Sequence, residues 1–224
     1  ALEYKITRGS WETVEKGPRG EEIANRRLVV ASAESVHVQV ATWRDATPEP
    51  RRASTLTGDV HHLGRVHSPA LGNDRDVWVW LPPSYAQSVA RRYPVIYFHD
   101  GQNVFDAATA FIGIEWGADE TLGRLTAARA MREAIAVAVA NTPQRMAEYT
   151  QAPDSRAGAP RADLYLKFLV EELKPRIDAA YRTLPGREHT ALVGSSLGGL
   201  VSLYAGVAAW QTFGLIGGVS PVVG

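Results

Sequence analysis

The stretch that decides the fold is Leu192-Val193-Gly194-Ser195-Ser196-Leu197-Gly198-Gly199-Leu200. It contains the pattern Gly-x-Ser-x-Gly with Ser196 at its centre. A strand-like apolar run, residues 189–193, precedes the pattern, and an apolar helical run, residues 197–210, follows it. The turn between them is strained, so the neighbours of its serine must lack bulk. This context predicts that Ser196 is a nucleophile at a tight strand–turn–helix junction.

The alternative serine, Ser195, does not satisfy the spacing, because Val193 and Leu197 stand where glycines would be needed. The helix that follows directs its first N–H groups toward the junction. We therefore predict that the backbone N–H of Leu197 binds a developing oxyanion.

A second oxyanion donor is expected from the loop after an earlier strand, here residues 98–103. Gly101 allows the backbone to approach a ligand, and the N–H of Gly101 or Gln102 is the candidate donor. His99 could act as a general base, but a histidine at a strand end is more often a hydrogen-bonded anchor. Asp100 is interpreted in the same way, as a brace of the loop.

The second half of the chain alternates strands and helices, which predicts an α/β domain with a mostly parallel sheet and helices on both faces. The expected strands are residues 76–81, 94–98, 134–140, 189–193 and 213–219, and the expected helices are residues 119–132, 162–181 and 197–210. Residues 1–44 are predicted to form a short β segment with strands at residues 3–6, 27–30 and 36–43. Residues 45–58 are rich in Pro and charge and are interpreted as a linker, which makes 59–224 the main domain.

Composition narrows the possible functions. The chain has 24 basic and 24 acidic residues and no cysteine. A net charge of zero gives no reason to expect a nucleic-acid partner or an anionic membrane, and no apolar run is long enough to span a bilayer. The lack of cysteine excludes disulfides, thiolate metal sites and a cysteine nucleophile.

Several blocks together resemble the putative esterase family of the α/β hydrolases, which includes enterochelin, feruloyl and acetyl-xylan esterases and mycolyltransferases. The matching stretches are residues 97–106, 115–121 and 168–175, Tyr181-Arg182 and the turn at Ser196. The resemblance implies an α/β-hydrolase fold and hydrolysis of a carboxylic ester through an acyl-serine, with no metal or cofactor. The expected substrate is a small-molecule or polysaccharide-linked ester. Because family members are often exported, it also favours a secreted or periplasmic location.

The N-terminal stretch, residues 4–15 with Asn25-Arg26, looks like the later strands of a starch-binding-like β-sandwich. Trp11 and Trp43 could stack on sugar there, but we favour core packing for both. This resemblance keeps open a second function class, a non-catalytic carbohydrate-binding protein on a hydrolase scaffold.

The family's catalytic triad runs from serine to an acid and then to a histidine, and this order cannot be completed here. Residues 197–224 contain no Asp, Glu or His. We expect the chain to be a C-terminally incomplete, inactive or weakly active fragment; the alternative is a hydrolase that has lost its triad. Acyl transfer instead of hydrolysis also remains open, because both share the acyl-serine.

Substrate choice is weakly encoded in the sequence. Arg145, Tyr149, Glu115 and Trp116 are candidates for lining a pocket, although Arg145 and Glu148 could simply pair with each other on the surface. The sequence predicts no oligomeric state.

Overall fold

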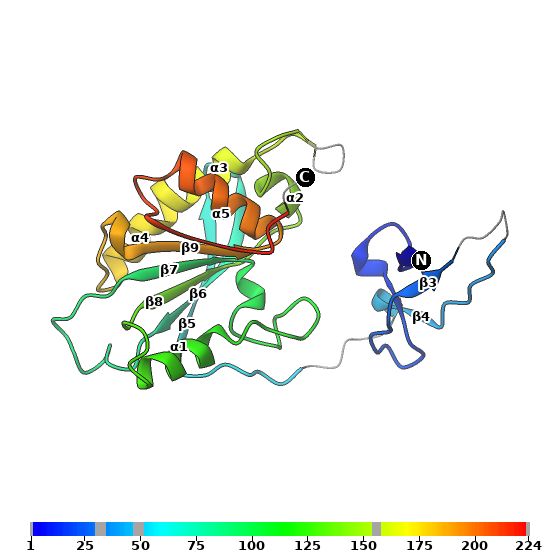
Figure 1. The fold of residues 1–224 in the computed structure, drawn as a ribbon, viewed down its shortest axis with the longest axis horizontal. Helices are drawn as coiled ribbons and strands as arrows, with labels where there is room; N and C mark the ends of the chain where they lie inside the picture. Colours follow the sequence, from blue (N-terminus) through cyan, green and yellow to red (C-terminus); the bar gives the residue numbers. More distant parts are fainter. Residues whose placement is uncertain (1, 30–34, 47–51, 154–157, 223–224) are drawn as a thin grey trace. The chain divides into compact units, whose positions relative to one another are not determined.

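The computed structural model describes residues 2–29, 35–46, 52–153 and 158–222 of the chain (Figure 1). The chain divides into two compact units, Ala1–Arg51 and Arg52–Gly224. Of the predicted linker, residues 47–51 lie outside the described residues, and residues 52–58 belong to the second unit. No helix in the described part of the chain is both long and apolar enough to cross a bilayer.

The first unit contains two short antiparallel strand pairs. β1 (Leu2–Tyr4) pairs with β3 (Arg26–Leu28), and β2 (Glu15–Lys16) pairs with β4 (Thr42–Trp43). The 3₁₀ turns η1 (Trp11–Thr13) and η2 (Arg44–Ala46) complete the unit. The strand expected at residues 36–43 is wrong except for its last two residues. Val36 is 50% exposed and Val38 and Val40 are only half-buried, and a strand without a partner is not stable.

The two tryptophans of this unit differ from each other in burial. Trp11 is 59% exposed, so core packing is wrong for this residue. Trp43 is half-buried, and the guanidinium of Arg8 lies 5.1 Å from its ring. The exposed indole of Trp11 is available for contact with a ligand.

The second unit is built on a six-stranded sheet with the order β10-β9-β7-β8-β6-β5. Its strands are β5 (Asp59–Ser68), β6 (Asn73–Leu81), β7 (Val95–His99), β8 (Ile135–Val139), β9 (Thr190–Ser195) and β10 (Leu215–Val219). Strands β8, β7, β9 and β10 run parallel, and β6 and β5 are antiparallel to their neighbours. The mostly parallel sheet is therefore confirmed. β5 was not expected, because this edge strand is mostly polar and a bulge between His62 and Arg65 interrupts its alternation.

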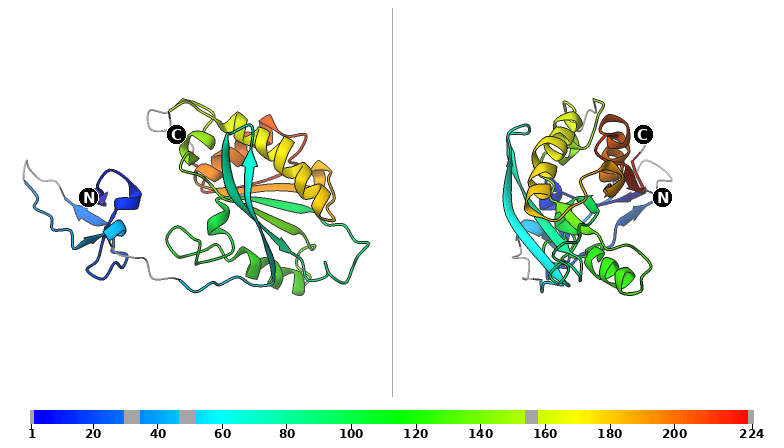
Figure 2. Two further views of the ribbon diagram at one scale, coloured as in Figure 1. Left: turned by 180° about the vertical axis from the view of Figure 1, so that it is seen from behind. Right: turned by 90° about the vertical axis from the view of Figure 1, so that its left-hand side faces the viewer.

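Helices cover both faces of this sheet (Figure 2). In β8 the odd-numbered residues Ile135, Val137 and Val139 pack in the larger hydrophobic cluster, beneath the helices of residues 162–208. The even-numbered Ala136 and Ala138 face α1 (Ala118–Ala127) on the other side. Alternate residues of a strand point to opposite faces, so this single apolar run serves two cores.

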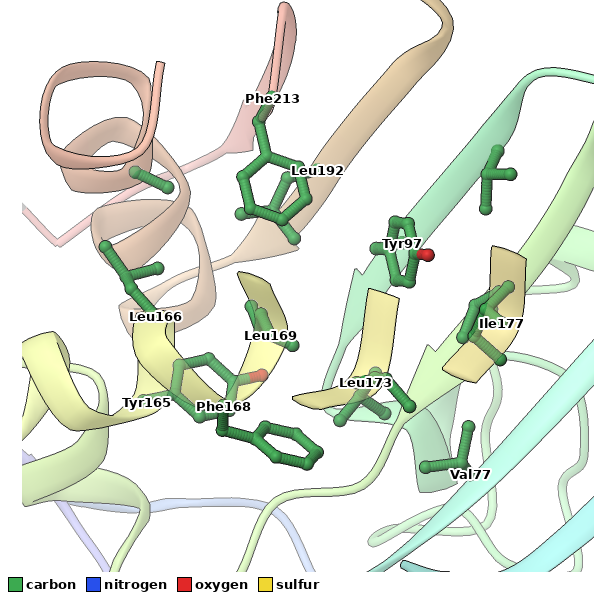
Figure 3. Packing of buried hydrophobic residues seen from close by; sticks show 14 of the residues in the cluster. Val77, Tyr97, Tyr165, Leu166, Phe168, Leu169, Leu173, Ile177, Leu192 and Phe213 are labelled. Carbon is green, nitrogen blue, oxygen red and sulfur yellow. The ribbon is translucent and has the colours of Figure 1, made fainter. Parts of the chain in front are cut away.

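The helix expected at residues 162–181 is present with one irregularity. It consists of α3 (Ala162–Lys167), a π-helical segment η4 (Phe168–Leu173) and α4 (Lys174–Ala180). Pro175 cannot donate a backbone hydrogen bond, which is compatible with irregular turns directly before it. Figure 3 shows Leu166, Leu169, Leu173 and Ile177 of this helix directed at Tyr97 and Leu192 of the sheet, where they form the centre of the core.

The remaining elements position the candidate site. They are η3 (Gly101–Asn103), α2 (Arg145–Glu148), η5 (Arg187–His189) and α5 (Leu197–Ala208). α1 ends at Ala127 and not at Arg132, since Arg129 adopts a positive φ of 54° that cannot continue a helix.

Candidate active site

Ser196 forms the tight turn between β9 and α5. Its backbone has φ 56° and ψ −122°, a conformation that is costly for a residue with a side chain. The turn is held by three backbone hydrogen bonds: the Ser196 N–H donates to the Val219 carbonyl at 3.0 Å, and the Ser196 carbonyl accepts from Leu200 at 3.0 Å and Val222 at 3.2 Å. The residue is exposed, so its hydroxyl can reach a substrate.

Two glycines make this turn possible. A Cβ atom at Gly194 would lie 2.4 Å from the backbone carbonyl carbon and oxygen of Gly198 and 2.7 Å from the His99 ring. A Cβ atom at Gly198 would lie 3.2 Å from both the His99 side chain and the Asp100 carboxylate. The strand and the helix therefore meet at Gly194 at a distance that only glycine permits, as the spacing of the motif predicts. The 99–103 loop lies in tight contact with Gly198, where a side chain would require a small shift.

Backbone strain gathers at one edge of the sheet. Four non-glycine residues in the described part of the chain have positive φ, and three of them are Asp100, Ser196 and Ser220. Each directly follows one of the neighbouring parallel strands β7, β9 and β10. Strained residues cluster at functional sites because only a rigid framework can hold them there. The carboxyl edge of these three strands is therefore the candidate active site.

The amides predicted for the oxyanion hole lie at the starts of two helices, α5 and the short η3. Leu197 is the first residue of α5, and Gly101 and Gln102 are the first residues of η3. The N–H groups at a helix start have no partner in their own helix. However, the lack of a side chain at Gly101 has a reason different from the one expected. A Cβ atom there would lie 2.5 Å from the β8 backbone at Ala138 and Val139, so strand packing, and not the approach of a ligand, requires this glycine.

His99 is a buried side chain beneath the turn. Its Nδ1 lies 2.8 Å from the hydroxyl of Tyr165, and its Nε2 has no hydrogen-bond partner among the described residues. Burial lowers the pKa of His99 to about 4; the nearby Asp100 opposes this shift, and Arg145 and Arg75 add to it. The ring is therefore neutral at pH 7, and its position in the core is that of an anchor.

Asp100 is clamped by residues that follow β8. Arg145 forms a two-pronged ion pair with it through Nε at 2.6 Å and Nη2 at 2.8 Å, and the Asn141 side chain donates at 2.6 Å. Arg145 does not pair with Glu148, which is buried and instead accepts from Arg75 at 3.0 Å. The clamp fixes the loop that carries the candidate oxyanion donors.

The other predicted substrate-binding residues lie in different environments. Tyr149 is fully buried; its hydroxyl accepts the Asp100 N–H at 3.3 Å, and burial raises its pKa well above the usual value. Trp116 is 38% exposed and packs edge-on against Phe98, with ring centroids 6.3 Å apart. Glu115 accepts a hydrogen bond from Thr55. In this arrangement Trp116 can contact a ligand, whereas Tyr149 supports the loop from beneath.

Two residues of this network were not singled out from the sequence, namely Asn141 and Tyr165. Asn141 follows β8 directly, so its place after a parallel strand was a signal that could have been used. Tyr165 lies in the predicted helix, and no local pattern distinguishes it from a core aromatic residue.

Two surface pockets of the second unit do not include Ser196 in their lining. One, of about 600 Å³, is bordered by Arg75 and by residues 140–144. The other, of about 540 Å³, lies between Trp80, Pro82 and the start of α1.

The buried His99 predicts a specific dependence of stability on pH. An unfolded histidine titrates near pH 6.5, whereas native His99 has a pKa of about 4, so the unfolded chain binds more protons between these values. His99 therefore contributes stability that is fully present above about pH 6.5 and is lost as the pH falls toward 4. We expect a loss of roughly 2 kcal/mol in unfolding free energy between about pH 7 and about pH 5 from this residue. Urea denaturation at both pH values measures the loss.

His99→Gln is the variant that tests this prediction. His67→Gln is its control, because His67 is exposed on β5. The His99 variant should lose roughly 2 kcal/mol of the pH dependence, and the His67 variant should keep it. An unchanged pH dependence in the His99 variant would show that this ring is not held neutral by burial.

Residues 68–224 match the family described as "Putative esterase". The chain belongs to this putative esterase family. The matched range includes the strained turn at Ser196, the 99–103 loop and the clamp on Asp100.

The chain is similar to several solved structures and, over a short stretch, to a curated protein. An IroE-like serine hydrolase from Shewanella oneidensis is 27% identical, with a TM-score of 0.53, over 69% of this chain and 48% of that chain. The ferric enterobactin esterase of Salmonella typhimurium is 25% identical, with a TM-score of 0.57, over 75% of this chain and 37% of that chain. An amylopullulanase of Thermoanaerobacter thermohydrosulfuricus is 48% identical over 48 residues, which are 20% of this chain and 3% of that protein. The chain thus spans about half or less of each of these proteins.

Proposed function

We propose that this protein is a serine carboxylic-ester hydrolase that acts through an acyl-serine intermediate. The observation that carries the proposal is the exposed Ser196 in a strained turn, packed against the loop of residues 99–102. The family match and the likeness to a serine hydrolase support it. Such a turn presents a nucleophile at the sheet edge and places helix-start amides around it.

The proposed reaction has two steps. The Ser196 Oγ attacks the ester carbonyl while a base takes its proton, and the alcohol leaves with that proton. The amides of Leu197 and of Gly101 or Gln102 donate to the oxyanion of the tetrahedral intermediate; one such donor is typically worth about 2.7–4 kcal/mol of barrier. Water then attacks the acyl-serine and releases the acid.

The general base and the acid of the triad are not assigned to any residue described so far. Residues 197–224 contain neither, and His99 is buried, neutral and hydrogen-bonded to Tyr165. We propose that a histidine and an acid encoded beyond residue 224 complete the triad. The 224-residue chain alone should then retain only the roughly 10³–10⁴-fold acceleration over water that binding and an oxyanion hole provide.

The substrate class we propose is a small-molecule or polysaccharide-linked ester. The similar solved structures include a ferric enterobactin esterase, which supports an ester as the substrate. Hydrolysis and acyl transfer share the acyl-serine and differ only in the acceptor, so the same site serves both. A secreted or periplasmic location remains our proposal for the compartment.

The experiment compares p-nitrophenyl acetate hydrolysis by residues 1–224 and by the full gene product. We expect saturable turnover from the full product and much slower turnover from the 224-residue chain. Equal turnover from both would overturn the proposed source of the base. The absence of any Ser196 acylation in the full product would overturn the hydrolase proposal itself.

A second candidate function, carbohydrate binding by the first unit, is favoured by its exposed Trp11. A short stretch of the chain also matches an amylopullulanase. An exposed indole is a suitable face for stacking on a sugar ring. We expect Trp11→Ala to weaken retention of the chain on insoluble starch by about tenfold, the equivalent of about 1.4 kcal/mol. Trp210→Ala is the control, since Trp210 is also exposed, at 51%, but lies in the second unit. Equal retention of both variants would argue against this role.

A further inference from the structure

Three carboxylates gather at the start of α1, away from Ser196. One oxygen from each of Glu115, Asp119 and Glu120 lies within 4.8 Å of the other two. Asp119 is 1% exposed, whereas Glu120 is exposed to solvent. The cluster therefore has a buried side and an accessible side.

Two of these carboxylates have a buried oxygen that nothing satisfies. Neither Asp119 Oδ1 nor Glu115 Oε2 has a hydrogen-bond partner among the described residues. A buried carboxylate oxygen without a donor costs free energy, because it has lost its water and gained nothing in return. A positively charged ligand bound by these carboxylates would give such atoms a partner.

The other oxygens of the same carboxylates are already in use. Asp119 Oδ2 accepts from the Thr57 backbone N–H at 2.6 Å and from its hydroxyl at 3.0 Å. Glu115 Oε1 accepts from the Thr55 hydroxyl. These bonds orient both side chains and tie the segment of residues 54–57, which runs below α1 in Figure 1, to the start of this helix.

The nearby Asp106 shows what a satisfied carboxylate looks like in this region. Its Oδ1 accepts from the Thr55 and Ala108 amides at 3.0 and 2.9 Å, and its Oδ2 accepts from the Ser54 hydroxyl at 3.0 Å. Both carboxylate oxygens of Asp106 therefore accept hydrogen bonds, in contrast to those of Glu115 and Asp119.

The helix terminus does not provide enough positive charge to balance the cluster. A helix N-terminus is equivalent to roughly half a positive charge, whereas three ionised carboxylates carry three negative ones.

We propose that Glu115, Asp119 and Glu120 bind a structural calcium ion. Ca²⁺ takes oxygen ligands, carboxylates above all, in a flexible geometry. Mg²⁺ demands a near-ideal octahedral arrangement and gives up its waters reluctantly. Three carboxylates from a loop and a helix start, with room for water on the exposed side, therefore favour Ca²⁺.

The site also has an access route and a consequence for the fold. The 540 Å³ pocket is lined by Asp119 and Glu120, so an ion and its remaining waters can reach the cluster from solvent. A bound ion would link the 54–57 segment, Glu115 in the loop before α1, and α1 itself. It would stabilise the second unit without taking part in the chemistry at Ser196.

The test compares the melting temperatures of wild type and Glu120→Gln in EGTA and in Ca²⁺, and we expect their order to reverse. In EGTA the variant should melt at a higher temperature than wild type, because one of three repelling charges is gone. In millimolar CaCl₂ the wild type should melt several degrees higher than it does in EGTA, and the variant should fall below it. Glu120 is exposed, so this substitution leaves the core intact.

Binding is measured directly by calorimetry with Ca²⁺ and, in parallel, with Mg²⁺. We expect saturable Ca²⁺ binding that weakens at least about tenfold in Glu120→Gln and in Asp119→Asn. Glu171→Gln, which removes an exposed carboxylate on the helix of residues 162–180, should bind Ca²⁺ as wild type does. The proposal is overturned if millimolar Ca²⁺ gives wild type neither binding heat nor a melting shift, if Mg²⁺ binds equally well, or if the two cluster variants respond to Ca²⁺ like Glu171→Gln.

Discussion

Replacing Ser196 with alanine is expected to abolish acyl-enzyme formation and, in a gene product that supplies the acid and base, to lower kcat by roughly 10⁶-fold. The hydroxyl at the tip of the β9–α5 turn is the only group proposed to form a bond with the substrate. The amides of Leu197 and Gly101 or Gln102 remain in the variant, so binding and weak oxyanion stabilisation should survive. Turnover of p-nitrophenyl acetate and the intact mass of the quenched enzyme measure the two effects separately.

The same substitution should have a small effect in residues 1–224 assayed alone, within about tenfold. Triad members act as a unit, so removing the nucleophile costs little if the base lies beyond residue 224, as proposed. This contrast distinguishes a missing base from a wrong nucleophile.

The control for this prediction is Ser195→Ala. Ser195 is the last residue of β9 and does not occupy the strained turn. It should keep turnover and acylation close to those of wild type. If Ser195→Ala removes the acyl group and Ser196→Ala keeps it, the assignment of the nucleophile is wrong.

Replacing Gly194 with alanine is expected to lower the free energy of unfolding by roughly 3 kcal/mol. The new Cβ would meet the carbonyl carbon and oxygen of Gly198 at 2.4 Å, and these backbone atoms cannot rotate away as a flexible side chain can. The strand and the helix must separate, which also displaces the turn at Ser196. Urea denaturation followed by circular dichroism measures the loss.

Gly123→Ala is the matched control. Gly123 lies within α1, and a Cβ there would meet nothing within 4 Å. Alanine in a helix interior is better than glycine by roughly 0.5–1 kcal/mol, so this variant should be slightly more stable than wild type. A Gly194 variant as stable as wild type would mean that the close contact between β9 and α5 is relaxed in solution.

Strand and helix positions in the second unit could largely be predicted from the sequence. Continuous apolar runs such as residues 135–139 are typical of strands buried on both faces, and the helix of residues 162–180 has a broad apolar stripe. The strand expected at residues 36–43 was mostly wrong because alternation alone does not provide a partner strand. The missed β5 is the converse case, a polar edge strand held by pairing with β6 along its length.

The sequence alone determined the position of the strained turn, because Gly194 and Gly198 allow the strand, the helix and the 99–103 loop to meet around Ser196. It also determined the alternation of strands and helices, which depends on local periodicity. Only the tertiary structure decided which polar groups are satisfied. Arg145 pairs with Asp100, His99 is buried beneath the turn, and Asp119 keeps an oxygen without a donor. These outcomes depend on which side chains, distant in sequence, the packed sheet brings within hydrogen-bonding distance, and no local pattern encodes that distance.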